Sequence, residues 1–110
     1  MRPRRRGDDA FLDDIREACA LLAASTRHKL LPDYVADPFF QHGVANLLAN
    51  IGEAAKNVSQ ATRDLYPSVE WRDMVKLRNK FVHSYWSIDP VKMWNIVKND
   101  IPKLLEILQP

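Results

Sequence analysis

The sequence predicts an all-α fold, an up-and-down bundle of four main helices with one short helical turn. Only three glycines occur among the 110 residues, and apolar side chains recur at three- and four-residue spacing along most of the chain. Proline and aspartate interrupt this pattern at points where helices are expected to begin and end. With 46% hydrophobic and 27% charged residues, the composition favours a folded globular domain over a disordered chain.

The N-terminal half divides at its prolines. The first apolar stripe predicts a helix over residues 9–26. Residues 29–37 should be a connection, in which Pro32 acts as a helix breaker. A second long helix is expected over residues 38–59, with Asp37 as its cap and a proline in its first turn.

The C-terminal half follows the same alternation. Residues 60–65 predict the short helical turn, and residues 69–85 predict the third long helix. After a break, the last helix should run over residues 90–108. Pro102 lies inside it and should kink it near residues 98–100, because proline cannot donate a backbone hydrogen bond.

The positive charge of the chain is concentrated at its start. We expect residues 1–8 to be a basic disordered arm and residues 9–110 to be the single folded domain. The arm holds four of the 16 Lys and Arg residues and one of the 14 Asp and Glu residues, which leaves 12 basic against 13 acidic residues in the body. Such a body is not a broad binder of duplex nucleic acid, which normally needs a basic face. The arm is expected to be a solvated tail, with contact to RNA phosphates or an acidic partner as the alternative. Its arginines are Arg2, Arg4, Arg5 and Arg6.

The cellular location of the protein is predicted from its apolar runs, from the residues that follow the arginine arm and from its single cysteine. No apolar run approaches the roughly 18 residues of a membrane span. The arginines are followed by Gly7-Asp8-Asp9 rather than by the apolar stretch of a signal peptide. Cys19 is the only cysteine and lies in the first apolar stripe, so we expect a small core hydrophobe in a cytoplasmic protein.

The second helix carries a row of small residues beside its main apolar stripe, Ala45, Ala49 and Gly52. Such a row lets another helix approach closely. The sequence leaves open whether that helix belongs to the same chain or to a second copy across a dimer interface.

Residues 78–85, RNKFVHSY, gather a cation, an amide, a titratable base and a phenol on the third helix. On a helical wheel, Arg78 lies between Trp71 on one side and Phe81 on the other, inside the apolar arc. A buried guanidinium needs an anion or several acceptors. Two interpretations follow. Arg78 forms a structural ion pair with Glu53 or another acid, or the apolar arc also forms an interface cleft in which Arg78 binds a phosphate bidentately.

Asn79 and His83 share a face beside Arg78, and Tyr85 lies two turns beyond it. Histidine suits proton transfer near neutral pH, although a lone histidine at a helix end is more often a hydrogen-bonding group. Metal-ligand spacings, Gly-rich phosphate loops and nucleophile elbows are lacking, so we expect no metal and no cofactor. An arginine and a histidine would suffice to cleave RNA, because RNA carries its own nucleophile, the 2′-OH.

Three blocks connect the chain to a known family: residues 51–55 (IGEAA), Tyr66-Pro67 leading to Trp71, and residues 77–86 with their LRN and HSYW ends. Residues 94–97 and 100–102 add a matching last helix. In this order and spacing, the chain resembles HepT-like toxins of the HEPN superfamily, small helical proteins of toxin–antitoxin pairs. The likeness covers about residues 8–108.

The resemblance implies a homodimer whose two motifs face each other across a cleft and act as a metal-independent endoribonuclease, a hydrolase with RNA as substrate. By this analogy Arg78 and His83 are catalytic, and Asn79 is a supporting polar neighbour. Tyr85 matches the family tyrosine that a nucleotidyltransferase antitoxin can modify with AMP (AMPylation), which would block RNA through charge and bulk. Glu53 fits the family pattern and, lying opposite the core stripe, is expected to reach Arg78 from a dimer neighbour.

Two alternatives stay open. The chain could be a non-catalytic helical module that binds a nucleotidyltransferase, or a nucleotide through Arg78, Asn79 and Tyr85. It could also be a structural bundle that dimerises through its row of small residues, although that would leave the position of Arg78 unexplained.

Overall fold

The computed structural model describes residues 7–84 and 88–109, with the side chains of residues 82–84 left out. The described residues form helices and no strand, which confirms the all-α class. The elements in chain order are α1 (Asp8–Thr26), α2 (Leu31–Val35), α3 (Pro38–Asn57), α4 (Gln60–Leu65), α5 (Trp71–Ser84), α6 (Pro90–Asn95), the π-helical turn η2 (Ile96–Asp100) and α7 (Ile101–Leu108).

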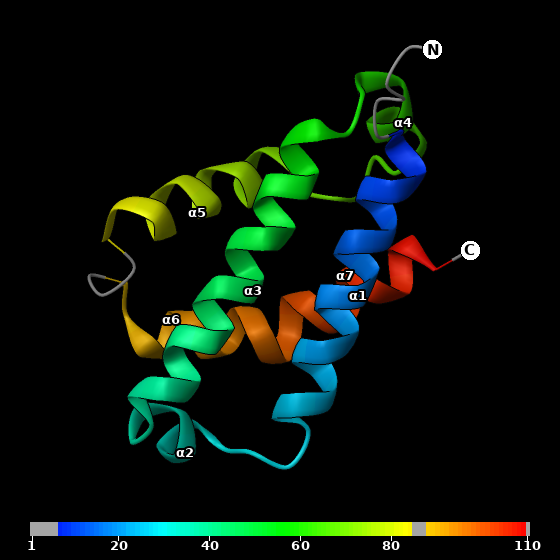
Figure 1. Ribbon diagram of the computed structural model, residues 1–110. Helices are drawn as coiled ribbons and strands as arrows, with labels where there is room; N and C mark the ends of the chain where they lie inside the picture. Colours follow the sequence, from blue (N-terminus) through cyan, green and yellow to red (C-terminus); the bar gives the residue numbers. More distant parts are fainter. Residues whose placement is uncertain (1–6, 85–87, 110) are drawn as a thin grey trace, which may run out of the picture.

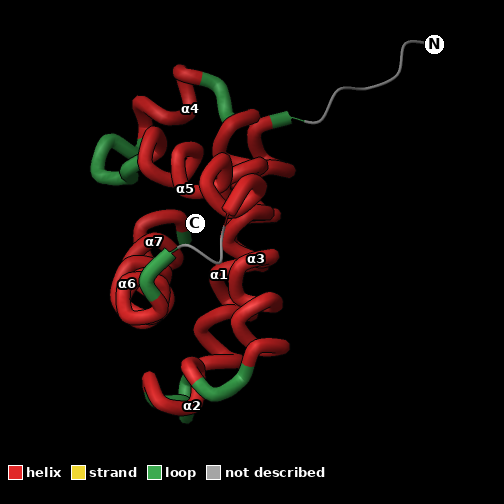
Figure 2. The backbone as a smooth tube through the Cα atoms, turned by 90° about the vertical axis from the view of Figure 1, so that its left-hand side faces the viewer, coloured by secondary structure: helices red, strands yellow, loops and turns green. Residues whose placement is uncertain are grey.

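The helices form two layers. α1 and α3 run side by side in opposite directions as one layer (Figure 1). The second layer consists of α5, which packs against α3, and the α6–η2–α7 segment, which packs against α1 (Figure 2). The core lies between the layers and consists mainly of buried apolar side chains from α1, α3, α5 and the α6–η2–α7 segment. The largest of its fully buried side chains include Ile15, Cys19, Leu22, Val44, Val97 and Leu108.

The segment predicted as a connection over residues 29–37 contains a helix, α2, so that prediction was wrong. Pro32 lies in the first turn of α2, where its missing N–H removes no helical hydrogen bond. The Asp33 carboxylate closes this turn by accepting a hydrogen bond from the Leu30 N–H at 2.8 Å. The Tyr34 ring is buried against Trp94 of α6, which holds α2 on the second layer.

Where a kink was predicted near residues 98–100, the structure has the π-helical turn η2. The Ile101 N–H donates to the Ile96 carbonyl, five residues back, in place of the usual four. Pro102 then occupies the first turn of α7. One continuous helical segment is thereby divided where the proline lacks a donor.

α1 begins at Asp8, one residue before the predicted start, and its first residue is fastened to another element. The Asp8 carboxylate accepts hydrogen bonds from the Ser59 N–H at 3.0 Å, from the Ser59 hydroxyl and from the Thr62 hydroxyl. Ser59 is also the N-cap of α4, since its hydroxyl accepts from the Thr62 N–H. The start of α1 is therefore tied to the start of α4.

Within the described ranges, no helix combines the length and hydrophobicity needed to span a lipid bilayer.

Candidate functional site

The close contact between α3 and α5 positions the candidate site. Gly52 is buried beneath α5, where a Cβ atom added to it would lie 2.2 Å from the Cβ of Arg78 and 2.7 Å from the Met74 carbonyl oxygen. Only glycine lets the two backbones approach this far. The open question about the row of small residues is thus answered at Gly52, because the helix that it admits belongs to the same chain.

Arg78 forms an ion pair with Glu53, the residue after this glycine. Its Nη2 lies 2.9 Å from the Glu53 Oε2, within one chain. The expectation that Glu53 would act from a dimer neighbour was therefore wrong. Glu53 does face away from the main apolar stripe of α3, but α5 passes along that edge, so the acid meets the arginine directly.

Asn79 completes the surroundings of the guanidinium. The Arg78 Nη1 donates a hydrogen bond of 2.9 Å to the Asn79 Oδ1. The two nitrogens at the end of the arginine thus have different acceptors, which fixes the plane of the group. The Arg78 side chain is 28% exposed and that of Glu53 is 50% exposed. Arg78 therefore lies at the rim of the core, where a ligand from solvent can reach it.

The structure brings Arg78, Asn79 and Glu53 together, three of the five site residues predicted from the sequence. His83 belongs to α5, and its side chain lies outside the described part of the chain. Tyr85 also lies outside the described residues. The predicted roles of these two side chains stay predictions.

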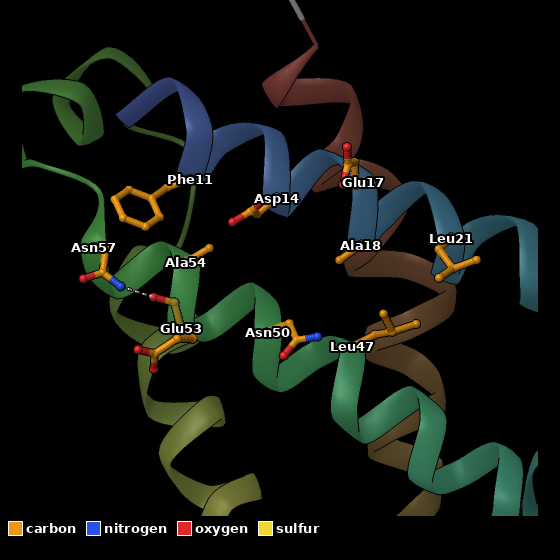
Figure 3. A pocket seen from close by; sticks show the side chains of 10 residues that line it. All are labelled: Phe11, Asp14, Glu17, Ala18, Leu21, Leu47, Asn50, Glu53, Ala54 and Asn57. Carbon is orange, nitrogen blue, oxygen red and sulfur yellow. Dashed lines mark hydrogen bonds between the residues drawn. The ribbon is translucent and has the colours of Figure 1, made fainter. Parts of the chain in front are cut away.

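One groove contains a residue of this site and another lies along α5, and neither was predicted from the sequence. One, of about 400 Å³, lies between α1 and α3 and includes Glu53 in its lining (Figure 3). The other, of about 720 Å³, separates α5 from the α6–η2–α7 segment. The periodic pattern showed the polar face of each helix, but it could not show which polar faces would meet.

Burial in the core raises the pKa of the Cys19 thiol to about 12, so the predicted core hydrophobe is confirmed. Among the side chains that the structure describes, no three His, Cys, Asp or Glu residues lie close enough together to hold a metal ion.

Comparison with known proteins decides the family. Residues 15–110 match the HepT-like family, described as "Ribonuclease HepT-like". The chain belongs to this family. The match includes both helices of the candidate site and confirms the resemblance seen in the sequence, whereas the arginine arm lies ahead of it.

Two relatives illustrate the similarity. The chain is 37% identical over 100 residues to "Probable ribonuclease HepT" of Thermococcus cleftensis, a match that covers 91% of each chain. It is 34% identical over 100 residues to a "Putative RNase" of Methanocaldococcus jannaschii, covering 91% of this chain and 92% of the relative. No solved structure matches the chain.

Proposed function

We propose that this protein is an endoribonuclease that cleaves RNA without a metal ion, at a site formed where two copies of the chain face each other. The proposal rests on the Arg78 guanidinium, which Glu53 and Asn79 orient at an exposed edge in a chain of a ribonuclease family. A guanidinium fixed in this way can receive a phosphate through charge-assisted hydrogen bonds without first being ordered.

In the proposed reaction, His83 accepts the proton of a ribose 2′-OH, and the 2′-oxygen attacks the neighbouring phosphorus. The bond from phosphorus to the 5′-oxygen of the next nucleotide breaks, and that oxygen takes a proton from water. Arg78 stabilises the charge that develops on the non-bridging oxygens. The products are a 2′,3′-cyclic phosphate end and a 5′-hydroxyl end.

The test is cleavage of an end-labelled RNA by the purified protein in the presence of EDTA. We expect 2′,3′-cyclic ends, and no cleavage at a position where the substrate carries a 2′-deoxy sugar. His83→Ala should slow cleavage by about 10²–10⁴-fold, the usual contribution of a general base. Lys80→Ala, an exposed change on the same helix, serves as the matched control. Equal rates for His83→Ala and the parent would contradict the mechanism.

We further propose that the protein is the toxin of a toxin–antitoxin pair and that a nucleotidyltransferase neutralises it at Tyr85. The phenol oxygen of Tyr85 would attack the α-phosphorus of ATP and release pyrophosphate, leaving AMP on the tyrosine. An AMP group close to Arg78 would place a phosphate where the RNA phosphate binds. A cognate nucleotidyltransferase with ATP should add the mass of AMP to the parent and stop cleavage. If Tyr85→Phe is modified and silenced equally, the assignment of Tyr85 fails.

A non-catalytic module that binds a nucleotidyltransferase or a nucleotide is the second candidate. It is favoured by one observation, that Glu53 already neutralises Arg78 within the chain. Under this reading the arginine is held back from RNA and released only by a partner. The same assay separates the two functions, because a binding module forms a tight complex while the pure dimer cleaves nothing.

A further inference from the structure

The groove between α1 and α3 is acidic. Among the residues described, the charged side chains that line it are Asp14 and Glu17 from α1 and Glu53 from α3 (Figure 3). Between the two helices lie small apolar side chains, including Ala18 and Ala54. A groove of this kind repels phosphates and suits a cationic chain whose aliphatic stems can lie on its apolar floor.

Glu53 connects this groove to the candidate site. The same carboxylate lines the groove and pairs with the Arg78 guanidinium at 2.9 Å. Any cation that enters the groove and binds Glu53 therefore competes with Arg78 for its partner. Occupation of the groove and the charge state around Arg78 are coupled through one side chain.

A cationic segment of this chain stands directly ahead of α1. The four arginines of the arm precede Gly7, the residue that caps α1. Five residues of extended chain span roughly 17 Å. Along α1, Asp14 lies about 10 Å and Glu17 about 15 Å from Gly7. An arm that turns back at Gly7 and runs along α1 is therefore long enough to reach both acids.

The charges of arm and groove are complementary. The arm carries four guanidiniums and the groove is lined by three carboxylates, and arginine binds carboxylates bidentately. Single exposed ion pairs are weak, but a tether of a few residues gives the arm a high effective concentration at the groove. RNA would be repelled by the same three acids, so the arm is the better occupant.

We propose that the arginine arm, Arg2 to Arg6, docks in the α1–α3 groove of its own chain against Asp14, Glu17 and Glu53, and that it competes with Arg78 for Glu53. Docking releases Arg78 from its ion pair. The docking itself does not depend on the proposed ribonuclease function, since it follows from the groove, the arm and the shared carboxylate.

The test places a spin label on the arm of the full chain. Arg2→Cys provides the attachment point, because the buried Cys19 thiol does not compete for the label. In a ¹⁵N-labelled sample, the amides of α1 and α3 that border the groove should broaden at low salt. The broadening should be lost at high salt and in the double variant Asp14→Asn, Glu17→Gln. Broadening confined to the first turn of α1 would overturn the proposal.

A matched control removes the same charge elsewhere. Asp64→Asn with Glu106→Gln changes two exposed acids outside the groove, and the broadening should persist. Loss of broadening in this control would reduce the effect to net charge and would overturn the specific site. A mixture of two proteins tests whether the arm docks on its own chain. One carries the spin label and no ¹⁵N, and the other carries ¹⁵N and no spin label. Broadening in that mixture would mean that the arm docks on a second copy, against the proposal.

The competition with Arg78 has its own readout in the side-chain NMR signals of that arginine. Changing Arg4, Arg5 and Arg6 to Gln should strengthen the Arg78–Glu53 pair and shift these signals, with slower rotation of the guanidinium. The Asp64→Asn, Glu106→Gln variant should leave them unchanged. Identical Arg78 signals in the parent and in the arm variant would refute the competition.

Discussion

Gly52 and Arg78 face each other across the tightest contact between α3 and α5. A Cβ on Gly52 would overlap the Cβ of Arg78 at 2.2 Å, and the next atom that it would meet is a backbone oxygen. Neither neighbour is the far end of a flexible side chain, so neither can move aside without moving α5 itself. The position of the proposed catalytic arginine thus depends on the absence of a single methyl group.

We expect Gly52→Ala to destabilise the protein by at least the ~1–3 kcal/mol typical of overpacked sites, and to move Arg78 away from Glu53. The unfolding temperature and the rate of RNA cleavage should both decrease. Gly43→Ala is the matched control, since it changes an exposed glycine of the same helix with nothing within 4 Å of the new Cβ. It should stabilise α3 by up to about 1 kcal/mol through helix propensity. A Gly52→Ala protein as stable and active as the parent would show that α5 is not held by this contact.

The sequence predicted the helices well, because apolar spacing records which side of each helix is buried. It could not predict which helix lies beside each polar edge. Glu53 shows this limit, since the wheel placed it off the core but did not show that α5 passes there. Pro32 shows another, because proline both ends helices and begins them, and the spacing could not show that Tyr34 of α2 packs on Trp94. For Arg78, the wheel identified the unusual position and the structure identified the partner.

Arg78→Ala should separate catalysis from stability. Its ion pair is partly exposed, and such pairs contribute only about 0–1 kcal/mol, so the unfolding temperature should change little. Cleavage should fall by about 10²–10³-fold, the usual effect of removing one charge-stabilising donor. The cleavage rate of Arg78→Lys should lie between those of the parent and Arg78→Ala. Lysine keeps the charge but lacks the planar guanidinium that contacts both Glu53 and Asn79. Single-turnover cleavage and thermal unfolding of the same samples provide the measurements. Cleavage that survives Arg78→Ala would remove this residue from the mechanism.

Asp8 should make stability fall at acid pH. Hydrogen bonds from the Ser59 and Thr62 hydroxyls and from the Ser59 N–H lower the pKa of its carboxyl below the ordinary 3.8. A lowered pKa in the folded state means that the stabilisation is present above 3.8 and is lost as pH falls through the folded value. Asp8→Asn should therefore lower the unfolding temperature at pH 7, and the difference from the parent should shrink on acidification below about pH 4. Asp9→Asn, an exposed neighbour, is the control. A difference that is constant from pH 7 to pH 3 would exclude ionisation of Asp8 as the cause.

The Cys19 thiol should be unreactive in the folded protein and should lower its stability at alkaline pH. Burial raises its pKa from 9.0 to about 12, so near pH 8 the native thiol should not react with a disulfide reagent until the chain is unfolded. Above pH 9.0 the unfolded chain loses the thiol proton while the folded chain keeps it, so stability is lost as pH rises toward about 12. Relative to Cys19→Ala, which has no thiol to ionise, the parent should lose up to about 1.4 kcal/mol per pH unit in this window. Denaturant unfolding of both proteins between pH 8 and pH 11 measures the slope. Parallel pH profiles would contradict a raised pKa for the buried Cys19 thiol.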